Sequence, residues 1–424
     1  MTTTLARVPG PTQPDSLGPG LSSLNPISLE NLLNPIPLYA ALQEREPVYW
    51  SEDVHAWFLT RYTDVVACLR DPRLSADRTN FFQQQLQGKA GEAAQGFFKW
   101  VSIQMTMRDG PDHIRVRRQV SPGFSPHSLD SYRPSIRHHM GQLLDRVQDR
   151  KQMDVVAEIS YQLPPLVIAE FLGIPGQDRD RFRAWAKPLA DMSNPSVDMD
   201  PVAVAHGAST AIAEMTDYFN TVMDERRRSP GLDLLSMLLH SQEVGQLSQA
   251  ELTANTILVL TAGHLTTTDQ LNNGIYNLLT HPDQVQKLRE DHTLLHTAVE
   301  EMMRFSPAVP FVFRVAAADF TLHGKNIRKG DTMFLGIASA NRDPSVFSEP
   351  NHFDIARDNM KQKHLLFGFG AHHCLGAGLA RRELEIAIEM LLERLPGLRL
   401  DEAQTPQPKL GLVSRGFNSM HLKW

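Results

Sequence analysis

One helical pattern that runs for about thirty residues without a break constrains this fold more than any other sequence feature. Ser248 and Glu251 form a capping box at its start, apolar residues then recur three and four apart, and the first proline is Pro282. A helix of roughly 32 residues is ~48 Å long, so it must cross a whole domain. Its centre, from Ala262 to Thr268, contains a glycine and three threonines that disfavour helix. This indicates a ligand close to the backbone, and a tolerated bend in a buried helix is the alternative.

The remaining sequence predicts a mainly α fold with small β-sheets. The helical period appears again at Thr210–Arg227, Glu251–Thr280, Asp283–Phe305 and Gly376–Leu395. Two hairpins are predicted, one from residues 47–50 with 56–59 and one from Phe320–Leu322 with Thr332–Leu335. Residues 36–424 contain no repeat or linker and are predicted to form a single large domain. Residues 1–35 are rich in proline and glycine and are expected to form a flexible arm.

Charge and composition exclude several classes of protein. The chain has 424 residues, of which 42 are basic and 48 acidic, and its net charge of −6 is too balanced for a dedicated nucleic-acid binder. No segment approaches the ~20 apolar residues of a membrane span, and the first residues do not resemble a secretory signal. We therefore expect a cytoplasmic protein without a membrane or nucleic-acid partner.

The chain has only two cysteines, which are too few for a disulfide framework, so each thiol is expected to act singly. Cys374 follows a glycine loop at the start of a predicted helix, where unpaired amides and the helix dipole stabilise a thiolate. Such a thiolate is a nucleophile or an axial metal ligand, and its apolar neighbours favour a flat hydrophobic partner. A zinc half-site with His372 and His373 is disfavoured because adjacent side chains diverge. Cys68 lies on an apolar helical face and is expected to be structural.

The loop around Cys374 resembles the haem-binding loop of the cytochrome P450 family. Phe367, Gly370, Cys374 and Gly376 match its Phe-x-x-Gly-x-x-x-Cys-x-Gly signature. Further matches are the Glu301–Arg304 pair, Asn341–Pro344 and Phe353–Asp354, and they occur in the family's order from about Pro35 to Trp424. The resemblance implies the P450 fold, haem b (iron protoporphyrin IX) as cofactor and Cys374 as the iron ligand.

The resemblance also implies roles for residues outside the signature. His113, Arg117, Arg314 and His372 resemble the groups that bind the haem propionates, while Phe367 and Gly376 would contact the cofactor. On the central helix the implied catalytic residues are Ala262, Gly263, Thr266 and Asp269. The expected substrate is an apolar or aromatic metabolite of moderate size, in a pocket containing Phe97, Phe98, Leu265, Val309 and Phe311. Residues 78–107 are expected to form a mobile cover over the haem.

Leu265 departs from the family pattern. Members usually carry an acid immediately before the helix threonine, and this acid–alcohol pair relays the protons used to break the O–O bond. Thr266 is kept, but leucine cannot relay a proton. Asp269 lies one turn along the helix and can partly substitute through water, whereas His264 points about 100° away from Leu265.

Two interpretations of the activity therefore remain. The first is a monooxygenase fed by a ferredoxin and its reductase, since the chain has no flavin or nicotinamide fingerprint. The second is a haem-thiolate enzyme of atypical chemistry, namely peroxide-driven oxidation or rearrangement or group transfer from a pre-activated substrate. A haem sensor is disfavoured because a sensor has little need for an apolar cavity large enough to hold a substrate. We expect a monomer in either case.

Overall fold

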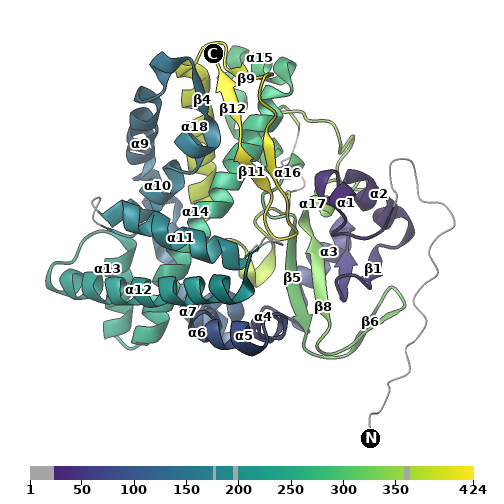
Figure 1. The fold of residues 1–424 in the computed structure, drawn as a ribbon, viewed down its shortest axis with the longest axis vertical. Coiled ribbons are helices and arrows are strands. Elements are labelled where there is room, and N and C mark those ends of the chain that lie inside the picture. The colour runs from purple at the N-terminus through teal and green to yellow at the C-terminus, as the bar shows by residue number, and fades with distance from the viewer. Residues whose placement is uncertain (1–22, 175–177, 194–198, 358–362) are drawn as a thin grey trace, which may run out of the picture.

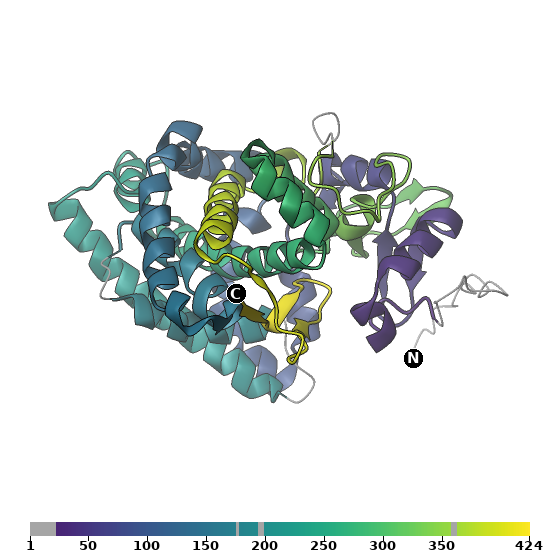
Figure 2. The same ribbon diagram turned by 90° about the horizontal axis from the view of Figure 1, so that it is seen from above.

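Helices form most of the computed structural model, which describes residues 23–174, 178–193, 199–357 and 363–424 (Figure 1). The α-helices are α1 (Leu29–Leu33), α2 (Ile36–Arg45), α3 (Tyr62–Arg70), α4 (Thr79–Gln85), α5 (Gly88–Ala93), α6 (Gln95–Ile103), α7 (Gly110–Val120), α8 (Pro126–Asp130), α9 (Arg133–Asp145), α10 (Leu163–Phe171), α11 (Arg179–Ser193), α12 (Pro201–Arg228), α13 (Leu234–Glu243), α14 (Gln249–Leu279), α15 (Pro282–Glu290), α16 (Leu295–Phe305), α17 (Ile337–Ala340) and α18 (Ala377–Arg394). In both views α9 and α10 lie on one side of the molecule and the largest sheet lies on the other (Figures 1 and 2). The mainly α architecture is therefore confirmed.

The strands form four small sheets. The largest has the order β1 (Val48–Ser51), β2 (Ala56–Leu59), β8 (Thr332–Gly336), β5 (Phe311–Ala316) and β3 (Leu74–Ser75), with only β2 and β8 parallel. The others pair β4 (Gln152–Asp154) and β9 (Arg399–Leu400) with β12 (His421–Lys423), β10 (Gln407–Lys409) with β11 (Gly416–Ser419), and β6 (Phe320–Leu322) with β7 (Lys325–Ile327).

The first predicted hairpin is confirmed, and the second is wrong. β1 and β2 pair with Val48 opposite Leu59, as expected from their alternation. The predicted partner of β6 was β8, but β6 pairs with β7 and β8 lies between β2 and β5. All five residues of β8 are buried, and a strand buried on both faces is suited to a central position in a sheet.

The long central helix α14 matches its prediction closely. Ser248 caps it, with the Glu251 amide donating to Ser248 Oγ at 3.2 Å and the Ser248 amide donating to Glu251 Oε2 at 2.9 Å. The threonine-rich centre stays helical, and its hydroxyl groups find acceptors within the helix, as Thr266 Oγ1 does in donating to the Ala262 carbonyl at 2.8 Å.

The single helix predicted over residues 283–305 is instead two helices. A 3₁₀ turn at His292–Leu294 separates α15 from α16. The Asp291 carboxylate accepts from the Thr293 amide at 2.9 Å and so starts a new helical turn. Sequence periodicity alone does not reveal this break because apolar residues continue on both sides of it.

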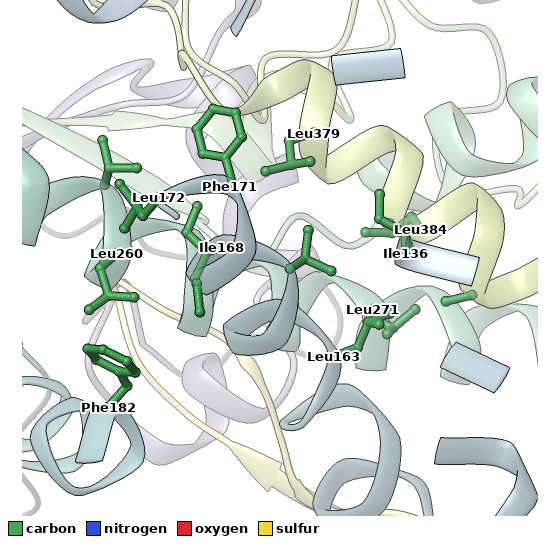
Figure 3. Close-up of a cluster of buried hydrophobic side chains, with 14 of the residues drawn as sticks. Ile136, Leu163, Ile168, Phe171, Leu172, Phe182, Leu260, Leu271, Leu379 and Leu384 are labelled. Atoms are coloured by element: carbon green, nitrogen blue, oxygen red, sulfur yellow. The ribbon is translucent and has the colours of Figure 1, made fainter. Parts of the chain in front are cut away.

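The main hydrophobic core gathers around α10, α14 and α18. Figure 3 shows Ile168 and Phe171 of α10 near Leu260 of α14 and Leu379 of α18, and all four side chains are buried. A smaller aromatic cluster supports the large sheet, where the Phe58 and Phe334 rings stack with centroids 5.0 Å apart. No described helix is both long and apolar enough to cross a membrane.

The predicted N-terminal arm is ordered where the structure describes it. Residues 1–22 lie outside the described part, but helix α1 occupies Leu29–Leu33. The Asn31 amide donates to Ser28 Oγ, and the buried Asn31 side chain donates to the Ser23 and Asn25 carbonyls at 2.9 and 2.8 Å. These local hydrogen bonds hold residues 23–33 in place, although the sequence of this segment has no apolar periodicity.

Candidate active site

A cavity of about 330 Å³ lies between the middle of α14 and the start of α18. One face of α14 lines it through Leu258, Val259, Ala262, Gly263, Thr266, Thr267 and Gln270. The cysteine loop, α7, β5, the start of α18 and residues 308–309 form other parts of the wall. The structure therefore brings together the two sequence features, the central helix and the cysteine loop, that pointed separately to a ligand.

Backbone geometry holds Cys374 in place. Gly368 and Gly370 have φ angles of +68° and +75°, which residues with a side chain rarely adopt, and a Cβ on Gly370 would lie 3.1 Å from the Leu69 carbonyl oxygen. The Cys374 amide donates to the Phe367 carbonyl at 2.8 Å. These constraints turn the chain so that the thiol lines the cavity just before α18.

The surroundings of Cys374 both raise and lower the pKa of its thiol. Burial raises the pKa of the thiol, because a thiolate is poorly solvated there. The amides of Gly376 and Ala377 donate to the sulfur, and Arg117 adds positive charge, so all three lower the pKa. The Cys374 side chain is open to the cavity and is provided with groups that stabilise a thiolate, which a bound cation would complete.

Four predicted propionate-binding residues line the same cavity: His113, Arg117, Arg314 and His372. The His113 and His372 rings stack with centroids 4.0 Å apart. Burial lowers the pKa of Arg314, and burial followed by the charges of His372 and Arg117 lowers the pKa of His113 to about 4. The Asp109 carboxylate lies 3.7 Å from His372 Nε2 and also accepts from the Ala76 amide at 3.0 Å. Two guanidinium cations together with hydrogen-bonding imidazole rings are suited to an anionic ligand.

The residues present fit a haem group. A single thiol with donated backbone hydrogen bonds suits an axial iron ligand, and the apolar walls formed by Val259, Val309 and Phe367 suit a porphyrin face. The partly desolvated cations suit two propionates. Each part of the group thus meets residues of matching chemistry.

Comparison with known proteins identifies the family. The family model described as cytochrome P450 matches residues 81–417. The chain is a cytochrome P450. It is 40% identical to cytochrome P450 CYP107DY1 of Priestia megaterium over 387 residues, covering 88% of this chain and 92% of that one. It is 36% identical to the polyketide biosynthesis cytochrome P450 PksS of Bacillus subtilis over 396 residues, covering 91% and 95%.

Solved P450 structures share the whole fold. The crystal structure of CalO2 has a TM-score of 0.86 at 31% identity and covers 95% of this chain and 99% of that one. P450BioI, crystallised with an acyl carrier protein that carries hexadec-9Z-enoic acid, has a TM-score of 0.84 at 32% identity and covers 94% and 100%. This P450 is accordingly a haem enzyme and a monooxygenase, an oxidoreductase acting on small molecules with redox partners.

The P450 helix α14 presents three of the four predicted catalytic residues to the cavity. Ala262, Gly263 and Thr266 line it, and Asp269 does not. The buried Asp269 carboxylate instead accepts from Lys409 Nζ at 2.8 Å and from the Ser414 hydroxyl. The expectation that Asp269 replaces the missing acid is therefore not met, because its charge is already paired outside the cavity.

Of the predicted substrate-pocket residues, only Val309 lines the cavity. Phe97 and Phe98 lie on α6 and are buried in the main core, and Phe311 packs edge-on against Phe58 at 5.4 Å. Leu265 does not line the cavity. The α14 residues that do line it recur at intervals of three and four, and Leu265 stands one position before one of them, Thr266. The expected cover over residues 78–107 contains the helices α4, α5 and α6, whose aromatic residues pack inward.

Sequence reasoning missed several lining residues, among them Arg78, Met105, Thr106, Gln270 and Glu383. The position of Gln270 could have been found from the helical period, since it lies one turn beyond Thr266. Glu383 is buried, its Oε2 has no hydrogen-bond partner among the described residues, and burial raises its pKa well above the ordinary value. The sequence contains no signal that would distinguish Arg78 or Glu383 from surface charges.

The predicted Glu301–Arg304 pair supports the site from behind. Both side chains are completely buried and joined by two hydrogen bonds of 2.7 and 2.8 Å. Arg304 also donates to the Asn341 carbonyl at 2.8 Å, and the Asn341 side chain accepts from the Leu365 amide at 2.7 Å. The pair thereby fixes the segment that leads into the cysteine loop.

Proposed function

We propose that this P450 inserts one oxygen atom of O₂ into an apolar or aromatic metabolite of moderate size, using electrons from a ferredoxin and its reductase. The observation that carries the proposal is the cavity in which the Cys374 thiol and the Thr266 hydroxyl occur together. When bound, haem b with a cysteinate ligand supplies the oxygen-activating chemistry. We further propose a monomer acting in the cytoplasm.

The residues of the chain would hold the haem and transfer protons. Cys374 would hold the iron, the guanidinium groups of Arg117 and Arg314 would offset the propionate charges, and the His113 and His372 rings would add hydrogen bonds to them. Thr266 carries the hydroxyl that can accept and pass on a proton at Oγ1, whereas the Leu265 side chain has no group that can carry a proton. The relay of protons is thus the step for which this chain is least equipped.

The substrate class is supported by the wall of the cavity and by similar proteins. Leu258, Val259, Val309 and Val312 form an apolar lining beside α14. Vitamin D(3) 25-hydroxylase of Pseudonocardia autotrophica is 38% identical over 372 residues, and P450 CYP267B1, solved with myristic acid, has a TM-score of 0.83 at 33% identity. Both names point to apolar compounds.

The test uses the haem-loaded protein with NADPH, ferredoxin, ferredoxin reductase and ¹⁸O₂. One ¹⁸O atom in the product, and no product without the electron donors, is expected. Product formation with hydrogen peroxide alone, at a rate that the donors do not raise, would contradict the ferredoxin-driven reaction.

A second candidate function is atypical haem-thiolate chemistry, that is, peroxide-driven oxidation or rearrangement or group transfer from a pre-activated substrate. Leu265 and the pairing of Asp269 with Lys409 favour it, because neither residue can deliver a proton to the cavity. The P450 enzyme CxnD, described for C–S bond formation in chuangxinmycin biosynthesis, has a TM-score of 0.80 at 31% identity and covers 92% of this chain and 94% of that one. The peroxide arm of the experiment above distinguishes peroxide-driven oxidation from the first candidate.

A further inference from the structure

Arg78 is a cavity residue that makes no hydrogen bond to a carboxylate within the described part of the chain. It lies between β3 and α4, and its Nη2 atom donates to the Thr106 carbonyl at 3.3 Å and to the Met107 sulfur at 3.2 Å. Its Cζ atom lies 5.1 Å from the centroid of the Phe313 ring. The Nε atom is buried and has no hydrogen-bond partner among the described residues. The guanidinium is therefore positioned by neutral groups only.

The carboxylates closest to Arg78 are committed elsewhere. Asp109 accepts from the Ser75 hydroxyl at 2.5 Å and from the Ala76 amide at 3.0 Å, and Asp77 is exposed and accepts from the Thr79 amide at 2.9 Å. Burial, followed by the like charge of Arg314, lowers the pKa of Arg78 to about 9. Asp77 and Asp109 oppose this shift only through space, and an inward-facing cation without a hydrogen-bonded counterion is costly, so a ligand that supplies negative charge gains from binding there.

The charges that line the cavity do not balance with haem alone. Arg78, Arg117 and Arg314 all line it, and Glu383 is the lining carboxyl, which burial holds neutral. Two propionates offset two of the three guanidinium groups. One guanidinium group, which has the charges of Asp77 and Asp109 near it but no hydrogen-bonded carboxylate, then remains for another ligand in the cavity.

We propose that Arg78 binds the carboxylate of the substrate, an apolar monocarboxylic acid whose hydrocarbon part contacts the lining. This rests on the proposed function and names its substrate class more narrowly. Arg117, Arg314 and the two histidines already provide four groups for two propionates. Arg78 comes from a different segment, and its contact Thr106 lines the cavity together with the apolar Met105. A guanidinium fork suits a carboxylate, and the apolar wall suits the rest of such an acid.

The experiment measures binding to the haem-loaded enzyme by calorimetry, with dodecanoate and methyl dodecanoate as probes. We expect the wild type to bind the acid at least about tenfold more tightly than the ester, as one hydrogen-bonded charge pair provides. Arg78→Met should remove this preference by weakening acid binding only, and Arg78→Lys should retain part of it. Arg73→Met is the matched control, since Arg73 is 51% exposed, pairs with Asp71 and does not line the cavity.

Haem content and the reduced carbon monoxide spectrum of the same samples show whether Arg78 binds the carboxylate of the substrate or a propionate of the haem. Haem retention by Arg78→Met together with loss of the acid preference supports the proposal. Haem loss in Arg78→Met, or equal binding of acid and ester by the wild type, overturns it and assigns Arg78 to a propionate or to no carboxylate. An acid preference in an enzyme that shows no oxygen-dependent turnover would count against the proposed function and leave the binding site supported.

Discussion

The two walls of the cavity differ in what determines them. The wall that contains Cys374 is set by the backbone, through glycines with positive φ and amides that donate to the sulfur. The opposite wall is one face of a regular helix, and its chemistry depends on single side chains such as Thr266 and Gln270. A regular helix accepts many side chains at one position, whereas the loop accepts few. Changes in the loop should therefore remove the cofactor site, while changes in α14 should alter the reaction.

The largest effect is expected at the loop, from Cys374→Ser. Loss of the thiolate should abolish the red-shifted Soret band of the reduced carbon monoxide complex, because that band requires a sulfur ligand. Cys68→Ala is the matched control, since Cys68 is buried outside the cavity and burial raises its pKa to about 12. Survival of the band in Cys374→Ser would disprove the ligand assignment.

The next effect is expected at the cationic edge, from Arg117→Met and Arg314→Met. Each should weaken haem retention by about 2–5 kcal/mol, because it leaves a partly buried carboxylate without its counterion. Haem transfer to apomyoglobin measures this, and the exposed Arg118 of α7 provides the control Arg118→Met. Unchanged transfer rates in both variants would remove these residues from the propionate site.

A smaller effect is expected on α14, from Leu265→Glu. An acid beside Thr266 should raise severalfold the fraction of NADPH electrons that ends in product, because it restores a proton donor. Leu265→Gln controls for polarity without an acid. If the wild type already couples NADPH tightly and Leu265→Glu gains nothing, then Leu265 is not a clue to the mechanism.

The smallest effect is expected from Glu383→Gln, on stability alone. Burial raises the pKa of Glu383 above 4.5, so the folded state favours the neutral acid. The wild type should then lose stability as the pH rises from about 4.5 toward the raised pKa, and the glutamine variant should not share this loss. The Tm difference between the two proteins should grow with pH, whereas Glu393→Gln, exposed on the same helix, should show no such trend.

The same contrast explains what the sequence could predict. Local rules identified α14 by its capping box, the first hairpin by its alternation, and the cysteine loop by its glycines. The partner of β8 and the inward packing of Phe97 and Phe311 depend on contacts between distant segments, which no local pattern contains. For the same reason Asp269 matched a helical spacing and still turned out to be paired with Lys409.

The hydrogen bonds of Arg304 indicate the order in which parts of this protein fold. Its hydrogen bonds reach Glu301, Asn341, Pro350 and His352, so they close loops of about fifty residues or fewer. Closing the cavity joins Arg117 to the His373 carbonyl across 256 positions. Short loops cost less entropy to close than long ones, so the support behind the cysteine should form early in folding. The cofactor would then be captured late, by a chain whose thiol-bearing half already has its final shape.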